Sequence, residues 1–207
     1  LSDFTNIRQN GKIAMKLNEN DELVSVIPCT DKDNVLLATR LGKAIRFDVN
    51  DVRVFVGRGS SGVRGIKLKP NDYVVSMSLI PQLDKRYILS VTENGFGKRT
   101  PIEDYRMTNR GGQGVANIEC STRNGPVVAS YVASEDDQIM LVTNSGKLIR
   151  IRVHGGEGDS IRVAGRKTQG VRLFDVDDEE KVVSVALLTE SDEEENADEN
   201  DNEVVID

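Results

Sequence analysis

One phrase recurs three times along the chain at nearly constant spacing. It reads ATRLGKAIR at residues 38–46, VTENGFGKR at residues 91–99 and VTNSGKLIR at residues 142–150. The central glycines, Gly42, Gly95 and Gly146, lie 53 and 51 residues apart. Each copy, here called the hairpin phrase, predicts two short strands joined by a tight turn, because such turns need residues that accept positive φ. A repeat of this length constrains the fold, since every unit must adopt the same local structure.

Two further phrases recur after each hairpin phrase. A glycine phrase begins with arginine and ends in Gly-Val at residues 58–63, 110–115 and 166–171. A valine phrase closes each unit at residues 74–76, 127–129 and 182–184, and residues 11–15 and 23–25 match the glycine and valine phrases of a further unit. Each unit thus predicts about four short strands, and four strands per repeat of roughly 40–50 residues are typical of a propeller-like array.

The predicted organisation is an all-β, propeller-like stack of four-stranded blades. We expect a partial blade at residues 1–34, blades at 35–86, 87–136 and 137–189, and an acidic tail at 190–207. Aromatic residues make up 4% of the chain and Trp is absent, so the cores must consist of Val, Ile and Leu. Because the first unit lacks its hairpin and residue 1 is not Met, we expect a piece of a longer protein, cut inside a repeat.

The first glycine phrase raises an alternative, because residues 57–62 fit the dinucleotide-binding pattern G-x-G-x-x-G. That fingerprint must open a helix, whose free N–H groups hold the pyrophosphate. Residues 63–68 instead alternate apolar and non-apolar side chains, which predicts a strand. The two other glycine phrases do not match the pattern. We therefore assign the phrase to the repeat architecture.

Charge is segregated along the chain. The net charge is −7, yet residues 190–207 hold ten acidic residues and no Lys or Arg. Residues 1–189 carry 27 basic and 24 acidic residues, a net +3, and residues 1–174 carry 26 and 19, a net +7. A tail of this composition buries too little apolar surface to offset its ordering entropy, so we expect it to be disordered and solvated.

Basic residues return at the same places in each unit. Arg46, Arg99 and Arg150 end the hairpin phrase, and arginines open the glycine phrases. Stacked units would align such residues into a cationic stripe along the outer side, which suits the phosphate backbone of DNA. The simpler alternative is a solvated face with a few ion pairs. The predicted DNA-binding residues are Arg40, Lys43, Arg46, Arg58, Arg64, Lys67, Lys98, Arg99, Arg106, Arg110, Lys147, Arg150, Arg152, Arg166, Lys167 and Arg172.

The predicted DNA binding is driven by shape and backbone contacts, because no zinc-finger or recognition-helix pattern is present for reading base edges. We expect the duplex to bend around the outer rim. The acidic tail either competes with DNA for the basic stripe as a tethered polyanion, or serves only to keep the protein in solution.

Residues 36–47, 61–68, 94–100 and 165–171 together resemble the C-terminal domain of the A subunit of bacterial DNA gyrase, and the resemblance covers about residues 1–189. It implies a six-bladed β-pinwheel whose basic outer rim wraps DNA, of which this chain holds the last part of blade three and blades four to six. It also implies a parent type II topoisomerase, an ATP-hydrolysing isomerase that introduces negative supercoils as a heterotetramer of two kinds of subunit, gyrase A with gyrase B. ATP and Mg would act elsewhere in that enzyme, so no cofactor is expected in this fragment.

Some alternatives stay open. The gyrase box Gln-Arg-Arg-Gly-Gly-Lys-Gly belongs to the first blade of the family; residues 109–114 look like a degenerate copy that lacks the second Arg and has Gln113 in place of Lys. The chain could instead resemble the C-terminal domain of the corresponding topoisomerase IV protein, or a protein-docking propeller. Exposed aromatics would mark a docking propeller, and the chain has nine Phe and Tyr in all.

We expect no catalytic residue and no metal site in this fragment. Tyr105 beside Arg106 looks like the tyrosine-arginine pair of type II topoisomerases, but that nucleophile belongs to another region, so Tyr105 is expected to be structural. His154 is the single histidine, and Cys29 and Cys120 lack metal-ligand spacing and are expected to be buried thiols. No apolar run approaches the roughly 18 residues of a membrane span. We therefore expect a cytoplasmic protein without a membrane partner.

Overall fold

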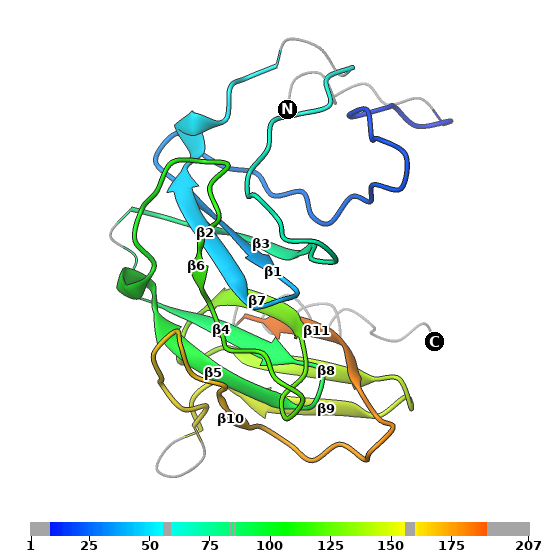
Figure 1. The fold of residues 1–207 in the computed structure, drawn as a ribbon, viewed down its shortest axis with the longest axis vertical. Coiled ribbons are helices and arrows are strands. Elements are labelled where there is room, and N and C mark those ends of the chain that lie inside the picture. The colour runs from blue at the N-terminus through cyan, green and yellow to red at the C-terminus, as the bar shows by residue number, and fades with distance from the viewer. Residues whose placement is uncertain (1–8, 56–58, 83, 85, 156–159, 190–207) are drawn as a thin grey trace, which may run out of the picture.

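The structure is a computed structural model that describes residues 9–55, 59–82, 84, 86–155 and 160–189 (Figure 1). The predicted acidic tail and Arg58 lie outside the described residues. Within them the chain is all-β, as predicted, and its strands are β1 (Asn34–Thr39), β2 (Lys43–Asp48), β3 (Val74–Ile80), β4 (Tyr87–Thr92), β5 (Phe96–Pro101), β6 (Val115–Ala116), β7 (Val127–Ala133), β8 (Gln138–Thr143), β9 (Leu148–Arg152), β10 (Val171–Arg172) and β11 (Val182–Leu188). Short 3₁₀ turns follow β2 at Val49–Asp51 and β5 at Ile102–Asp104.

The three predicted hairpins form where the sequence places them. β1 pairs with β2, β4 with β5, and β8 with β9, all antiparallel. The turn glycines Gly42, Gly95 and Gly146 have φ values of 76°, 75° and 84°, a region that glycine enters without the steric cost of a side chain. The hairpin phrase therefore forms a β-hairpin in each of the three units.

The valine phrases also form strands, as predicted. β3 pairs with β1, β7 with β4, and β11 with β8, each antiparallel and each with an irregularity at the end next to the hairpin turn. Three contiguous strands per repeat thus come from the hairpin and valine phrases.

The fourth strand of each complete sheet comes from the following repeat. The first sheet has the order β3-β1-β2-β6 and the second β10-β5-β4-β7, while the described residues give a third sheet β11-β8-β9. β6 and β10 begin at the last residue of the second and third glycine phrases, so the sheets cross the contiguous blade boundaries expected from the sequence. Glycine makes the exchange possible: a Cβ on Gly114 would lie 2.3 Å from the Ala44 carbonyl oxygen, and one on Gly170 would lie 2.7 Å from that of Gly97.

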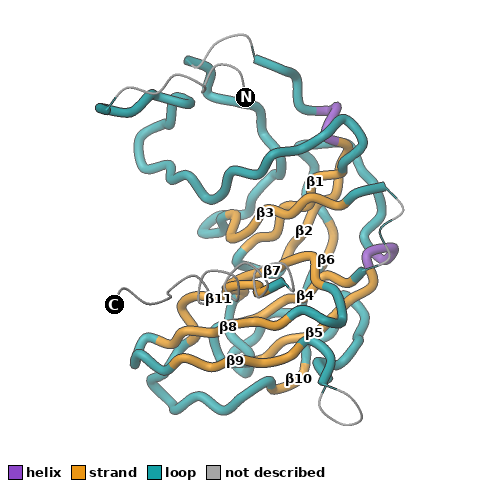
Figure 2. Tube along the Cα trace, turned by 180° about the vertical axis from the view of Figure 1, so that it is seen from behind, coloured by secondary structure: helices purple, strands orange, loops and turns teal. Residues whose placement is uncertain are grey.

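The valine-phrase strands form the inner side of the stack. β3 contacts β7, and β7 contacts β11. In both views β7 lies between β3 and β11 (Figure 2). Because β3 and β6 occupy opposite ends of the first sheet, β6 marks its outer edge, and β10 marks the outer edge of the second.

Backbone hydrogen bonds at the hairpin tips join consecutive repeats on the inner side. The Arg40 N–H donates to the Tyr73 carbonyl of its own unit at 2.9 Å, and the Arg40 carbonyl accepts from the Val127 N–H of the next unit at 2.8 Å. Glu93 repeats the pattern, donating to Pro126 and accepting from Val182. Each hairpin tip is therefore bonded to two successive valine phrases.

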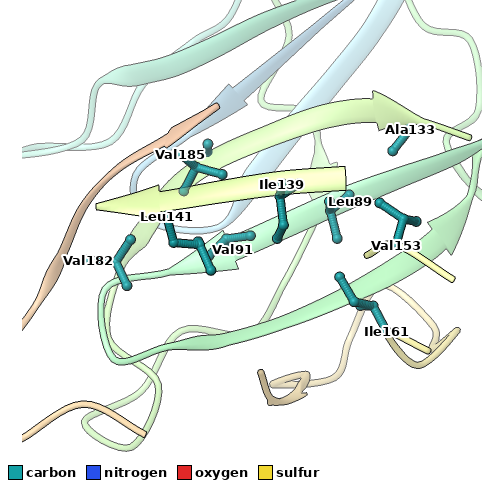
Figure 3. Packing of buried hydrophobic residues seen from close by; sticks show 10 residues of the cluster. Leu89, Val91, Ala133, Ile139, Leu141, Val153, Ile161, Val182 and Val185 are labelled. Atoms are coloured by element: carbon teal, nitrogen blue, oxygen red, sulfur yellow. The ribbon is translucent and has the colours of Figure 1, made fainter. Parts of the chain in front are cut away.

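Apolar cores fill the spaces between neighbouring sheets. The larger one lies between the second and third sheets and includes Leu89, Val91, Ile139 and Leu141 (Figure 3). Another joins the first and second sheets through Leu36, Ala44, Ile80, Ile88, Ile102, Tyr105 and Val132. Stacking thus buries the apolar faces that a single sheet would leave exposed, as in other repeat proteins.

A buried polar network centres on Asn117. Its Oδ1 accepts from the Tyr105 hydroxyl at 2.6 Å and from Ser90 at 3.2 Å, and its Nδ2 donates to Ser130 Oγ at 2.9 Å. Burial raises the pKa of the Tyr105 hydroxyl. Tyr105 is therefore a core residue, as expected for a structural tyrosine.

Two sequence expectations differ from the structure. The sequence pattern predicts a strand at residues 63–68, yet these residues form none, and no strand lies within residues 9–33. The equivalent residues 115–116 and 171–172 are strands because each pairs with the hairpin of a preceding repeat, and within the described residues no such hairpin accompanies residues 63–68. Cys29, expected to be buried, is exposed, while Cys120 is half-buried.

Candidate nucleic-acid interface

The outer edges of the first and second sheets are built from equivalent connecting segments. Met107 forms a parallel bridge with Arg46 on β2, and Val163 forms one with Arg99 on β5. The N–H of Thr108 donates to the Arg46 carbonyl at 2.9 Å, and that of Ala164 donates to the Arg99 carbonyl at 2.8 Å. These segments lie beside β6 and β10 and form the outer rim with them.

Two of the hairpin arginines anchor these segments. Arg99 is 4% exposed; its Nε donates to the Ile161 carbonyl at 2.7 Å, and its guanidinium pairs with Glu135 at 3.5 Å. Half-buried Arg46 donates to the carbonyls of Ile102 and Tyr105 at 3.3 and 3.4 Å, and burial lowers its pKa. The prediction that Arg99 faces outward is wrong, because carbonyl groups of the incoming segment need donors that this side chain supplies.

Lys98, also predicted to contact DNA, is fully buried. Its Nζ donates to the Gly165 carbonyl at 2.5 Å. Burial, aided by the nearby Arg166, lowers the pKa of this ammonium to about 8. Lys98 therefore holds the third glycine phrase in place from beneath, and its predicted outward position is wrong.

The arginines that open the glycine phrases join one repeat to the preceding one. Arg110 donates to the Arg64 carbonyl at 2.5 Å, and Arg166 donates to the Ala116 carbonyl at 3.0 Å. The two acceptors are equivalent, because each lies six residues after the arginine that opens the preceding glycine phrase. Both guanidinium groups are half-buried, so much of their donor capacity serves the backbone.

Three other predicted contacts have acidic partners. Lys147 pairs with Glu180 at 2.7 Å and with Asp177 at 3.0 Å, Arg172 pairs with Asp175, and Arg40 pairs with Glu93 at 2.5 Å. Hydrogen bonds from Lys147, Ser145 and Thr143 lower the pKa of the Glu180 carboxyl to about 2. The positive charge of these residues is therefore partly neutralised in place.

A second set of predicted residues is exposed and has no ion-pair partner among the residues that the structure describes: Arg64, Lys67, Arg106, Arg152 and Lys167. Lys43 is half-buried on β2. Arg150 is exposed as well, and its Nε donates to Gln138 Oε1 at 2.7 Å. The five exposed residues of the set are the ones most available to a polyanion.

Six exposed cations of the described residues lie outside the predicted set: Lys16, Lys32, Arg53, Lys69, Arg123 and Arg162. Two of them belong to a recurring triplet of an apolar residue, arginine and a second apolar residue, which reads VRV at residues 52–54, YRM at 105–107 and IRV at 161–163. The triplet stands a few residues before each glycine phrase. That spacing was the signal that could have found Arg53 and Arg162 together with Arg106.

The chemistry of these exposed side chains suits anions along a broad surface rather than a small molecule in a pocket. In the described part of the chain there is no group of three or more His, Cys, Asp and Glu side chains that could hold a metal ion. No helix of the described residues is long and apolar enough to cross a membrane. A hollow of about 1130 Å³ on the inner side is lined by the exposed side chains of Leu23, Val24, Tyr73 and Val183 and by the Arg40–Glu93 pair.

Antiparallel sheets that stack through their inner strands and exchange their outer strands define a β-propeller type of domain, here with cations along its outer edges. The family described as DNA gyrase C-terminal domain, beta-propeller, matches residues 1–30, 33–81, 86–125 and 137–189. The chain belongs to this family.

Comparison with individual proteins agrees with this assignment. The A subunit of DNA gyrase from Rickettsia prowazekii is 39% identical over 245 residues; the match covers 96% of this chain but 26% of that protein, so the chain spans about a quarter of its relative. A solved DNA gyrase A C-terminal domain is 31% identical with a TM-score of 0.74, covering 91% of this chain and 60% of that one. The C-terminal domain of a DNA topoisomerase IV is 27% identical with a TM-score of 0.75, covering 90% and 57%.

Proposed function

We propose that this chain binds duplex DNA without sequence specificity and wraps it along its outer rim, as the C-terminal domain of a gyrase A protein. The observation that carries the proposal is the set of exposed arginines and lysines for which the described residues provide no acidic partner, several of them on the outer edges of neighbouring sheets. Family membership supports it. Base-edge recognition is not part of the proposal, because the described rim offers strands and loops but no recognition helix.

The energetics favour many modest contacts over a few strong ones. Bending a site of 20–30 base pairs costs on the order of 1–6 kcal/mol. Each phosphate contact by Lys or Arg releases condensed counterions, which gives affinity without sequence information. A rim that repeats with every blade supplies such contacts along a curved path.

For the whole protein, we propose that this chain serves an ATP-dependent type II topoisomerase that introduces negative supercoils. Its partners would be the rest of the gyrase A chain, together with gyrase B, in a heterotetramer, in the cytoplasm where the chromosome lies. ATP and Mg would bind outside this chain. The role of the described residues would be to hold a curved DNA segment.

The salt dependence of duplex binding tests the proposal. Log affinity should fall linearly with log salt, with a slope near −0.9 per phosphate neutralised. Duplexes of unrelated sequence should bind equally well. A flat salt dependence would exclude a phosphate-binding rim.

Wrapping needs a separate measurement. A nicked plasmid is resealed by ligase with and without the protein, and its linking number is compared. We expect a shift that grows with protein concentration. Binding without any shift would leave phosphate binding standing but refute wrapping.

The likeness to the topoisomerase IV domain, with its TM-score of 0.75, favours that domain as a second candidate. The two candidates differ in the first blade of the parent protein, where the gyrase family carries its box. An intact box there would support gyrase, and a degenerate one would support topoisomerase IV.

A further inference from the structure

The recurring apolar-arginine-apolar triplet, here called the rim triplet, has the same burial pattern in the second and third repeats. Its first residue, Tyr105 or Ile161, is buried in the core. Its arginine is exposed in each repeat. Its last residue is an exposed apolar side chain: Met107 is 45% exposed and Val163 43%. The buried residue thus anchors a pair of outward side chains, one cationic and one apolar.

The triplets also occupy equivalent places in neighbouring sheets. The parallel bridges from Met107 to Arg46 and from Val163 to Arg99 put them at the same register of β2 and β5, on the outer side. The first copy, Arg53 followed by Val54, has the same sequence pattern and an apolar side chain that is 93% exposed. One such pair therefore occurs in each of the three repeats.

The triplet arginines differ from the anchoring arginines of the rim in what they bind within the protein. Arg99, Arg110 and Arg166 donate to backbone carbonyls of adjoining segments. For Arg106 and Arg162 the described residues provide neither an ion pair nor a side-chain hydrogen bond, so both guanidinium groups are available to a ligand. An exposed apolar residue at the same place in each repeat calls for a ligand that offers apolar surface beside its charge.

Bent duplex DNA offers both surfaces together. Its phosphates attract guanidinium groups, and its deoxyribose rings and minor-groove walls accept apolar side chains that help to open or kink a step. We propose that the pairs Arg53–Val54, Arg106–Met107 and Arg162–Val163 are the points at which successive blades contact the bent duplex. The arginine binds a phosphate, and the apolar side chain packs against the sugars at the minor groove. This inference rests on the proposed DNA binding and names the residues that perform it.

Two double variants test separately the arginine and the apolar side chain of the proposed DNA contact. Arg106→Ala with Arg162→Ala should make the log–log salt slope shallower by about 1.8, since each lost phosphate contact removes about 0.9. Met107→Ser with Val163→Ser should leave the slope unchanged, lower the affinity about tenfold, and reduce the bend measured by energy transfer between the duplex ends.

Matched controls come from the inner side of the stack. Lys181→Ala removes one positive charge and Val183→Ser one exposed apolar side chain, both at the inner hollow. Neither should change the slope or the bend. Arg106→Lys with Arg162→Lys, which keeps the charge, should keep the slope, and thermal unfolding should show that every variant is folded.

The outcomes separate this inference from the proposed function. Salt-dependent binding by the wild-type chain, with both double variants unchanged, would overturn the inference and leave DNA binding intact. A loss confined to the arginine variant, with the bend and affinity of the serine variant unchanged, would also overturn the paired contact. Absence of salt-dependent binding by the wild-type chain would instead refute the proposed function itself.

Discussion

The Nε of Arg99 donates a hydrogen bond to the carbonyl oxygen of Ile161, 62 residues further along the chain, at 2.7 Å. Arg99 ends the hairpin phrase of the second repeat. Ile161 belongs to the third repeat and begins the segment that lies along the outer edge of β5. A side chain that the repeat pattern marks as a surface cation thus fastens two repeats together.

Replacing Arg99 by alanine should therefore lower the free energy of unfolding. The lost charged hydrogen bond leaves the Ile161 carbonyl buried without a donor, which costs roughly 1.5–3 kcal/mol. Arg150→Ala is the matched control, since Arg150 ends the equivalent hairpin phrase but is exposed; its cost should stay within about 0.5 kcal/mol. Urea unfolding of the two variants measures both values, and equal losses would refute the anchoring role of Arg99.

The strand exchange can be tested at Gly114. Gly114→Ala would place a Cβ 2.3 Å from the Ala44 carbonyl oxygen at a φ of 68°. Overpacking should cost about 1–3 kcal/mol, and the left-handed backbone about 1–2 kcal/mol more. Gly165→Ala, where a Cβ would meet no atom within 4 Å, should change little. Similar melting temperatures for the two variants would mean that β6 does not cross β2 as closely as described.

Tyr105→Phe tests the buried polar network. The change removes the hydroxyl that donates to Asn117 at 2.6 Å and should cost about 1 kcal/mol. Tyr73→Phe makes the same chemical change at an exposed tyrosine, whose hydroxyl lies beside Arg40, and should cost much less because water replaces the lost contact. The difference between the two free energies of unfolding in urea measures the hydrogen bond, and a difference of zero would contradict it.

Acid stability should depend on Glu180. Its pKa is lowered to about 2 in the folded chain by hydrogen bonds from Lys147, Ser145 and Thr143, against an ordinary value of 4.5. A lowered carboxyl pKa contributes stability that is complete above the unfolded pKa and is lost as the pH falls from about 4.5 to about 2.

Glu180→Gln should therefore flatten the decline of stability across that acid range. Glu179→Gln alters the exposed neighbouring residue and should leave the decline as it is in the wild-type chain. Denaturation midpoints measured at intervals from pH 5 to pH 2 compare the three proteins. An unchanged decline in Glu180→Gln would show that the carboxylate does not stabilise the hairpin tip.

The sequence predicts well those parts of the fold that depend on neighbouring residues alone. Gly42, Gly95 and Gly146 supply turns whose backbone needs positive φ, so the hairpins form where expected. The all-β class and the family follow from the repeated phrases for the same reason. The order of strands within each sheet was not predictable in this way, because β6 joins β2 through pairing with a segment some 70 residues away.

The exposure of the rim arginines was also not predictable from the repeat pattern. Arg99 and Arg150 hold the same position in the hairpin phrase, yet one is buried and the other exposed. The difference lies in whether a segment of a following repeat covers the strand, as residues 161–164 cover β5. Arg162 could have been found from the sequence, because its triplet recurs a few residues before each glycine phrase, but the burial of its neighbour Ile161 is seen only in the structure.

The exchange of outer strands has a consequence for how such a protein can grow. The second repeat brings β6, which completes the sheet of its predecessor, and a hairpin that receives β10 from its successor. A unit of about fifty residues can therefore be duplicated or deleted without creating a new kind of contact surface, because each copy fits any neighbour of the same pattern. Growth by whole units would therefore keep the contact between neighbouring blades the same.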